Sequence, residues 1–318
     1  MKILAIESSC DETAAAVVED GTKIISSVVA TSHEMHEKYG GIVPEVAARE
    51  QLKVIIPMIT EATKNTSYDA IAVTVGPGLI GSLLVGVETA KTIAMVTGKP
   101  LIPVNHVLAH MYANFVNNKS IEFPAISLVV SGGHTELYLM TNMKELIWLG
   151  GTIDDAAGEC FDKAARLLGF GHGGGLAIQE AAIGITKSTI HLPRPMLDKK
   201  NELNFSFSGL KTAILRAWQT NPDPNLKQML AYEVQEAITD VLVKKTLKAA
   251  DKLGAKSILL SGGVSSNLRL REKLPSAIAP PIYLCTDNAV YIAAYAYFRG
   301  GKTPWKDITA VPDLSVEI

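Results

Sequence analysis

Two histidines and a distant aspartate have the residue types of a metal site. His106 and His110 are four residues apart, so a helix would place both side chains on one face, at a spacing that suits a shared metal ion. The residues between them are Val-Leu-Ala, without the glutamate of a zinc protease. Asp287 follows a short apolar segment and is the best candidate for a third ligand. Two packed or surface histidines are the alternative.

An acidic pair near the N-terminus offers a second chemical group. Asp11 and Glu12 stand between two apolar segments, at residues 3–6 and 14–18, so we expect them in a turn between two strands. Carboxylates there can hold hydrated Mg²⁺ near phosphates or accept a proton. A polar hairpin tip without a chemical role is the alternative.

Three glycine-containing loops suit phosphate binding. Ser-Gly-Gly follows an apolar segment twice, at residues 131–133 and 261–263, and Gly-Pro-Gly occupies residues 76–78. Glycines at the end of a buried strand let backbone N–H groups approach a phosphate, and ligands of open α/β sheets bind at such ends. For each loop taken alone, an ordinary glycine turn is the alternative.

Three further groups have both a structural and a functional interpretation. Asp162, beside the glycines at 173–175, could bind ribose hydroxyls. Ser206 or Ser208 could cap a helix. A helical stripe of lysines is either a solvated face or a phosphate-contacting patch; it consists of Lys244, Lys248 and Lys252.

The apolar periodicity predicts two successive rounds of strands and helices. The first round has strands at 3–6, 14–18, 24–29, 70–75 and 101–104, and helices at 44–63, 81–96 and from about Asn105. The second has strands at 125–130, 136–140, 257–260 and 282–284, and helices at 154–168, 209–220, 226–253 and 289–298. Glycines and a proline interrupt the uncharged stretch at 70–87, which favours a strand, loop and helix over a membrane span.

Composition excludes several classes of protein. With 318 residues, 47% hydrophobic and 19% charged, the chain is long enough for two domains and is not intrinsically disordered. Lys and Arg number 30 against 32 Asp and Glu, so any nucleic-acid contact must come from a local patch. Three separated cysteines indicate reduced thiols. Because the first apolar run ends at Glu7, we expect no secretory leader and a cytoplasmic location.

Taken in order, these segments resemble the TsaD family of tRNA adenosine threonylcarbamoyltransferases. The resemblance runs from Ile3 to about Ala294 and rests on residues 6–13, 39–45, 76–79, 106–110, 130–135, 154–159, 204–212, 261–264, 267 and 286–288. The bacterial branch is favoured, because His134 follows the first Ser-Gly-Gly and Val129 stands where archaeal relatives supply a tyrosine ligand.

The resemblance implies an α/β fold of two RNase H-like lobes, as in the actin/Hsp70/sugar-kinase superfamily, with an active-site cleft between them. The first lobe would span residues 1–118 and the second residues 119–287. The C-terminal helix, at about 288–300, would pack back on the first lobe. Where relatives carry Tyr-Pro-Gly-Gly-Pro, this chain has His-Gly-Gly-Gly-Leu at 172–176, and the loss of both prolines predicts a less rigid loop.

The resemblance also implies a reaction. The threonylcarbamoyl group of threonylcarbamoyl-adenylate would pass to N6 of the adenosine beside the anticodon, in tRNAs that read codons beginning with A, and AMP would leave. His106, His110 and Asp287 would bind one divalent metal, iron in preference to zinc, while Asp11 and Glu12 would lie near the reacting centre. Mg²⁺ could accompany an adenine nucleotide. The residues that would bind the adenylate are Val129, Val130, Ser131, Gly132, Gly133, Asp162, Gly175 and Asn267.

The implied partners are tRNA, a non-catalytic paralogue and a small P-loop ATPase, with no membrane. An ATP-dependent small-molecule kinase of the same fold is one rival, since it would use the same glycine loops and acidic turn. A non-catalytic scaffold is another. Neither gives the histidine pair a role. The family's older label, a glycoprotease, is the third.

Overall fold

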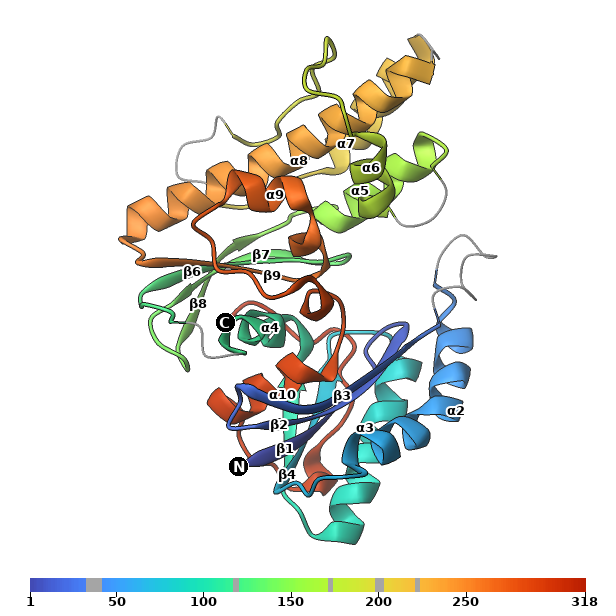
Figure 1. Ribbon diagram of the computed structural model, residues 1–318, viewed down its shortest axis with the longest axis vertical. Helices are drawn as coiled ribbons and strands as arrows, with labels where there is room; N and C mark the ends of the chain where they lie inside the picture. Colours follow the sequence, from blue (N-terminus) through green and yellow to red (C-terminus); the bar gives the residue numbers. More distant parts are fainter. Residues whose placement is uncertain (33–41, 117–119, 171–173, 198–202, 221–223) are drawn as a thin grey trace. The chain divides into compact units, whose positions relative to one another are not determined.

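The computed structural model describes residues 1–32, 42–116, 120–170, 174–197, 203–220 and 224–318. One part of the family resemblance, residues 39–41, lies outside these residues, and so do His172 and Gly173 of the loop that departs from the family. The chain forms two compact units (Figure 1). The first unit consists of Met1–Ser120 and Thr286–Ile318, and the second of Ile121–Cys285.

The first unit contains a five-stranded sheet in the order β3-β2-β1-β4-β5. Its strands are β1 (Lys2–Glu7), β2 (Glu12–Glu19), β3 (Lys23–Thr31), β4 (Ala70–Gly76) and β5 (Leu101–Asn105). The first three strands form an antiparallel meander, whereas β4 and β5 continue the sheet in parallel with β1. Parallel strands need a crossover connection, and helices supply it here.

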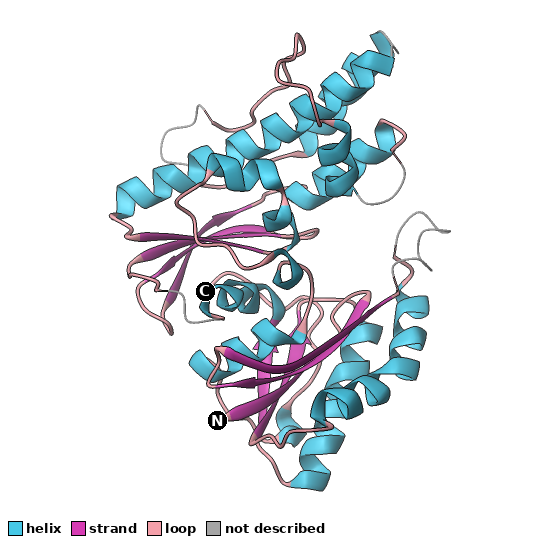
Figure 2. Cartoon of the chain, in the orientation of Figure 1, coloured by secondary structure: helices cyan, strands magenta, loops and turns pink. Residues whose placement is uncertain are grey.

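Helices cover both faces of this sheet (Figures 1 and 2). They are α2 (Pro44–Thr63), α3 (Ile80–Thr97), the short α4 (His106–His110) and α10 (Ala289–Phe298), with 3-10 turns at Met111–Phe115 and Trp305–Asp307. Pro44 begins α2, as expected, because the first helical position needs no backbone N–H. Side chains alternate along a strand, so Leu4 and Ile6 pack in the core under α2 and α3, and α10 covers the opposite face.

Helix α3 is long and apolar enough, by length and composition alone, to cross a membrane. However, it connects β4 to β5, and these strands are paired neighbours in one sheet. It also buries Val87, Ala90 and Ala94 in the core of the first unit. These contacts are those of a helix packed on a sheet, which agrees with the expected strand, loop and helix in this part of the chain.

The second unit has a four-stranded sheet in the order β8-β7-β6-β9. Its strands are β6 (Ala125–Val130), β7 (Thr135–Met140), β8 (Leu146–Gly151) and β9 (Ser257–Ser261). Its helices are α5 (Ala157–Leu167), α6 (Gly174–Ala181), α7 (Ser208–Thr220), α8 (Pro224–Leu253) and α9 (Leu268–Lys273), with 3-10 turns at Gly263–Ser266 and Ile282–Leu284. Phe161, Phe205 and Phe207 are fully buried in its core between sheet and helices.

The structure corrects four expectations about the elements. The segment Ile282–Leu284 is a 3-10 turn rather than a strand, and it follows two prolines, which supply no N–H for strand pairing. Helix α5 begins at Ala157 rather than at residue 154. Glu12 is the first residue of β2, so only Asp11 of the acidic pair lies in the turn. Strand β8 and helices α6 and α9 were not expected at all.

Candidate metal centre and nucleotide-binding loops

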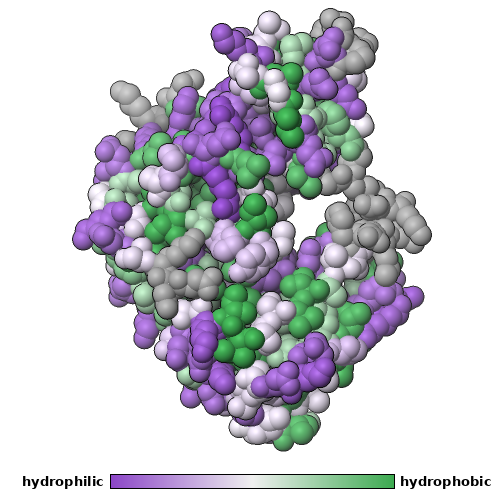
Figure 3. All heavy atoms as spheres, in the orientation of Figure 1, coloured by the Kyte–Doolittle hydropathy of each residue, from purple (hydrophilic) through white to green (hydrophobic). Residues whose placement is uncertain are grey.

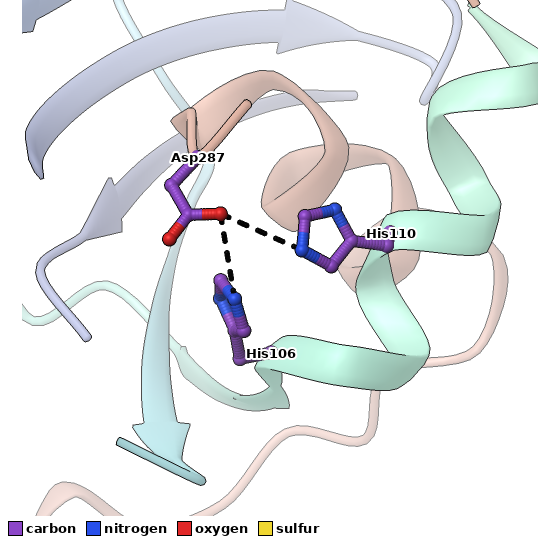
Figure 4. Close-up of side chains that lie close together, drawn as sticks. All are labelled: His106, His110 and Asp287. Carbon is purple, nitrogen blue, oxygen red and sulfur yellow. Dashed lines mark ion pairs between the residues drawn. The ribbon is translucent and has the colours of Figure 1, made fainter. Parts of the chain in front are cut away.

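His106, His110 and Asp287 come together in the first unit (Figure 4). Nε2 of each histidine lies 3.5 Å from Oδ1 of Asp287, and the three candidate ligand atoms are within 4.8 Å of one another. Ligand atoms of a tetrahedral ion with bonds of about 2.1 Å are about 3.4 Å apart. The donor set and its spacing therefore fit one divalent cation.

Two asparagine caps hold the ligand segments in place. Asn105 is the last residue of β5. Its side chain accepts hydrogen bonds from the backbone N–H groups of Val107 and Leu108, at 3.1 and 3.2 Å. Helix α4 therefore begins at His106, and both histidines lie on one face with ring centroids 4.7 Å apart. On the other side, Asn288 accepts from the N–H of Val290 at 3.0 Å and starts α10 directly after Asp287. Such caps fix where a helix begins.

Glu7 lies behind His106, although the sequence did not single it out as a site residue. It ends β1, is fully buried, and places Oε2 3.1 Å from Nδ1 of His106. Burial raises the pKa of Glu7, but His106, the Thr74 hydroxyl and the Ser9 N–H outweigh it and hold the pKa below its usual value. The available signal was a charged residue at the end of an otherwise apolar buried strand.

Tyr291 of α10 is a second residue that sequence reasoning missed. Its hydroxyl donates to Oδ1 of Asp287 at 3.3 Å, and its ring centroid lies 4.5 Å from that of His110. Burial, together with the charge of Asp287, raises the pKa of Tyr291 well above its usual value, so the phenol keeps its proton as a donor. The available signal was its position four residues after Asp287, but aromatic residues are common in a buried helix.

Negative charge accumulates around the candidate ligands. Burial and the neighbouring Asp287 and Asp11 raise the pKa of Glu12 to about 10. Burial also raises the pKa of Asp287. His106 lowers this pKa, but the charges of Glu7 and Asp11 add to the effect of burial, and the pKa stays above its usual value. Burial lowers the pKa of His106, but Asp287 and Glu7 raise it to about 9. Buried carboxylates that repel one another are stabilised by a cation, so this electrostatic environment also fits a metal ion.

The acidic pair is held against this cluster by α2. The Gln51 side-chain amide donates to the backbone carbonyls of Cys10 and Glu12, at 2.8 and 3.2 Å. The backbone carbonyl of Asp11 accepts from the N–H and the hydroxyl of Ser32, at 3.1 and 2.9 Å. The structure thus brings the acidic pair and the predicted ligands into one region of the first unit.

The two Ser-Gly-Gly sequences leave the second sheet at the same end, because β6 and β9 are parallel neighbours. A Cβ built at Gly132, Gly133 or Gly263 meets no heavy atom of the described chain within 4 Å. The space beside these glycines is open to a ligand. Gly262 differs: its φ is +87°, and a Cβ there would collide with the carbonyl of Val130. The fold therefore requires glycine at this position, whether or not a ligand binds nearby.

Helix α5 starts directly against the first of these loops. The N–H groups of Gly158 and Glu159 donate to the carbonyls of Ser131 and Gly132, at 3.3 and 3.1 Å. A Cβ at Gly158 would collide with the Ser131 carbonyl. The loop is therefore fixed from one side by the first turn of α5 and remains open on the side of Gly132.

Of the other predicted nucleotide residues, Val129 and Val130 are buried in β6. Asp162, Gly175 and Asn267 lie on or at the start of neighbouring helices of the second unit. Asp162 is exposed on α5, and its carboxylate lies so close to Gly174 that no Cβ would fit there. A Cβ built at Gly175 would lie 3.9 Å from the Phe161 side chain, an ordinary contact distance. The Asn267 side chain accepts from the N–H of Leu270 at 3.0 Å, which caps α9, and its amide donates to Gln235 at 3.0 Å. Its polar atoms are thus bonded within the protein.

The third glycine loop serves packing instead of an open phosphate site. A Cβ at Gly76 would collide with the Val311 carbonyl, and one at Gly78 would come within 2.5 Å of the Ser9 carbonyl. The N–H of Gly78 donates to the Pro312 carbonyl at 3.0 Å. The glycines at 76–78 therefore allow close approach of two other chain segments.

Asp154 takes the role that the sequence assigned to Ser206 or Ser208. Its Oδ1 accepts from the N–H groups of Phe207 and Ser208, at 2.8 and 3.2 Å. Both serine hydroxyls donate to its Oδ2, at 2.6 and 2.8 Å. Asp154 does bind the N-terminus of a helix, as the sequence predicted, but the helix is α7 and not α5.

Known proteins match this chain over most of its length. The family model described as tRNA N6-adenosine threonylcarbamoyltransferase, TsaD, matches residues 23–294. A protein of that name from Persephonella marina is 48% identical over 314 residues, which cover 94% of this chain and 90% of that protein. One from Dehalococcoides mccartyi is 48% identical over 329 residues, with 99% of both chains covered.

Solved structures confirm the expected fold. Full-length HypF, in a phosphate- and nucleotide-bound form, has a TM-score of 0.63 at 13% identity, covering 93% of this chain and 46% of HypF. Component A of (R)-2-hydroxyglutaryl-CoA dehydratase from Acidaminococcus fermentans has a TM-score of 0.55 at 15% identity, covering 93% of this chain and 98% of that one. At these identities the likeness concerns the fold alone. The family match and the curated relatives show that this chain belongs to the TsaD family of tRNA N6-adenosine threonylcarbamoyltransferases.

Proposed function

We propose that this chain transfers the threonylcarbamoyl group from threonylcarbamoyl-adenylate to N6 of the adenosine beside the anticodon. The substrates are tRNAs that read codons beginning with A, and AMP is released. Membership of the family supports the reaction. The observation that carries it for this chain is the convergence of two histidine nitrogens and one aspartate oxygen within 4.8 Å. The kinase and scaffold alternatives give that convergence no purpose.

His106, His110 and Asp287 are the proposed ligands of one divalent metal, iron in preference to zinc. Imidazole and carboxylate donors suit both ions. A metal held there would supply a Lewis acid able to polarise the carbonyl of the threonylcarbamoyl group. Three protein ligands leave coordination positions for substrate or water.

Asp11 and Glu12 are proposed to act on the attacking adenine amine, by orienting it or by accepting its proton. Without a bound cation, Glu12 has a pKa of about 10 and keeps its proton at neutral pH. A cation on the neighbouring ligands would lower that pKa and free the carboxylate. Glu12→Gln separates the two roles, because the amide can still orient the amine but cannot accept its proton.

The adenylate is proposed to bind at the open glycines of the second unit. Support comes from the free space beside Gly132, Gly133 and Gly263, and from Asp162, an exposed carboxylate that can accept from ribose hydroxyls. Mg²⁺ is a second candidate cation when an adenine nucleotide is bound. The two units would correspond to the family's two lobes, for which the resemblance gives 1–118 and 119–287.

The proposed partners beyond tRNA are a non-catalytic paralogue and a small P-loop ATPase, and the proposed location is the cytoplasm. With a net charge of −2, the chain has no general electrostatic attraction to tRNA. Sharing the tRNA contacts with other subunits would compensate for this deficit.

The test is to supply unmodified tRNA, synthetic threonylcarbamoyl-adenylate and bacterial-type partners, then digest the tRNA and search for N6-threonylcarbamoyladenosine by mass spectrometry. The double variant His106→Ala/His110→Ala should yield no product. His191→Ala, which changes an exposed histidine of the second unit, should retain full activity. Full transfer by the double variant would contradict the metal-centred reaction.

The same assay separates the alternatives. No modified adenosine, together with ATP turnover on a small-molecule acceptor, would support the kinase. No product, with intact binding to partner subunits, would support the scaffold. Peptide hydrolysis that survives the histidine substitutions would support the older protease label.

A further inference from the structure

We propose that Glu7 is a positioning residue that accepts the Nδ1 proton of His106 and thereby presents Nε2 of this histidine to the metal. The inference rests on the proposed metal site and extends it by one residue. It starts from a contact inside the first unit: Oε2 of Glu7 lies 3.1 Å from Nδ1 of His106, and Glu7 is fully buried.

The surroundings of Glu7 are those of a hydrogen-bond acceptor. The N–H of Ser9, which can only donate, points at Oε1 from 2.6 Å. The Thr74 hydroxyl lies 2.5 Å from Oε2, the oxygen that also faces His106. Ser9 and Thr74 donate to the two oxygens, so both oxygens act as acceptors, and the imidazole nitrogen that faces Oε2 carries a hydrogen.

The tautomer of His106 follows from this contact. A neutral imidazole has one N–H and one lone pair, so a proton on Nδ1 leaves the lone pair on Nε2. Nε2 is the atom that lies 3.5 Å from Oδ1 of Asp287. A carboxylate behind a ligating histidine fixes its tautomer and ring orientation and increases its basicity.

A purely structural role is the competing explanation. Through Thr74, Glu7 ties β1 to β4, and through Ser9 it fixes the following turn. The Ser9 hydroxyl also lies 3.3 Å from Nδ1 of His106 and is a second potential acceptor. Two control variants address these points: Thr74→Val removes a partner of Glu7 but leaves its histidine contact, and Ser9→Ala removes the rival acceptor.

Glu7→Gln separates the two explanations because an amide cannot satisfy all of these donors. If the amide oxygen faces Ser9, the NH₂ group faces Nδ1 of His106, which must then accept. The imidazole proton moves to Nε2 and blocks metal binding. If the oxygen faces His106, two N–H groups oppose each other at Ser9.

The experiment measures Zn²⁺ affinity of the full-length protein by chelator competition and the thermal stability of each apo variant. Glu7→Gln is expected to weaken Zn²⁺ binding by about 10–100-fold, the usual effect of losing such a partner. Thr74→Val and Ser9→Ala should change it by less than about threefold, because the carboxylate still faces His106. Binding by Glu7→Gln within about threefold of the original protein would overturn the inference.

The variant His106→Ala/His110→Ala distinguishes this failure from failure of the metal site. If it binds Zn²⁺ as well as the original chain, the proposed ligands are wrong, and the inference is overturned with them. If only the double variant loses binding and Glu7→Gln does not, the metal site stands and the role of Glu7 is wrong.

A second measurement needs no folded Glu7 variant. The Zn²⁺-loaded original chain, labelled with ¹⁵N-histidine, should show a protected imidazole N–H proton bonded to Nδ1 of His106. The signal is assigned by its loss in His106→Asn. A proton on Nε2 of His106, with Nδ1 on the metal, would overturn the inference.

Discussion

The Tyr291 hydroxyl lies 3.3 Å from Oδ1 of Asp287 and donates to it. The same oxygen is 3.5 Å from Nε2 of His106 and of His110. One carboxylate oxygen is therefore held by a buried phenol while it faces both candidate ligands. This hydrogen bond restricts the orientation of the carboxylate.

Removing this phenolic hydroxyl should weaken metal binding only moderately. Tyr291→Phe keeps the ring against His110, at 4.5 Å between centroids, and deletes one donor to Asp287. One hydrogen bond contributes about 0.5–1.5 kcal/mol net, so we expect a loss of Zn²⁺ affinity of about tenfold or less. Chelator competition measures it. Asp287→Ala should lose far more, and equal losses in the two variants would show that Tyr291 does more than hold the carboxylate.

Gly132→Ala should impair nucleotide binding while leaving stability almost unchanged. A Cβ at Gly132 meets no heavy atom of the described chain within 4 Å, so the methyl group costs the fold little. It does occupy the space proposed for the adenylate. Calorimetric titration with AMP, alongside thermal unfolding, measures both effects.

Gly158→Ala should lower the stability of the protein more than it weakens AMP binding. Its Cβ would collide with the Ser131 carbonyl, so the melting temperature should fall by several degrees, as expected for a core collision of about 1–3 kcal/mol. A lowered melting temperature for Gly132→Ala with unchanged AMP binding would contradict the proposed nucleotide site.

Asp154→Ala should destabilise the second unit through α7. The variant loses the acceptor for the N–H groups of Phe207 and Ser208 and for two serine hydroxyls. Loss of a helix cap costs about 0.5–2 kcal/mol, measurable by urea unfolding. Asp251→Ala, an exposed aspartate on α8, is the matched control. An equal effect in the control would argue against the cap.

A network of opposite charges links α8 and α9, where Figure 3 shows hydrophilic residues gathered. Lys273 lies 2.9 Å from Glu236 and 2.7 Å from Asp240. Arg269 pairs with Glu236 at 2.6 Å, and Arg194 with Asp240 at 3.0 Å. Burial raises the pKa of both carboxyl groups, but these cations outweigh it and hold each pKa below its usual value.

These lowered pKa values determine how the stability contributed by the network changes with pH. A carboxyl whose pKa is lowered by folding stabilises the protein above its unfolded pKa, and loses that contribution as pH falls through the folded pKa. Lys273→Met should therefore cost most stability near about pH 7 and progressively less towards about pH 3. Urea unfolding at several pH values measures the difference from the original chain. Lys252→Met is the control, and a pH-independent cost would contradict the assignment.

Local patterns were enough for most of the elements. Pro44 begins α2, glycine pairs follow β6 and β9, and the i,i+4 histidines do lie on one face of α4. These features depend on backbone periodicity and on the steric freedom of glycine, which act over a few residues. Helix α5 was misplaced because an aspartate suits any helix start, and Asp154 caps a helix whose start lies 54 residues further along the chain.

The sequence by itself determined the family, most of the strand-and-helix order and the histidine pair, because these are written in residue types and short spacings. Only the tertiary structure decided that Glu7 lies behind His106, 99 residues away, and that the glycines at 76–78 pack against the C-terminal segment. It also decided that the Tyr291 ring lies 4.5 Å from the His110 ring. Such contacts depend on which strands pair and which faces are buried together, and this emerges only when the whole core packs.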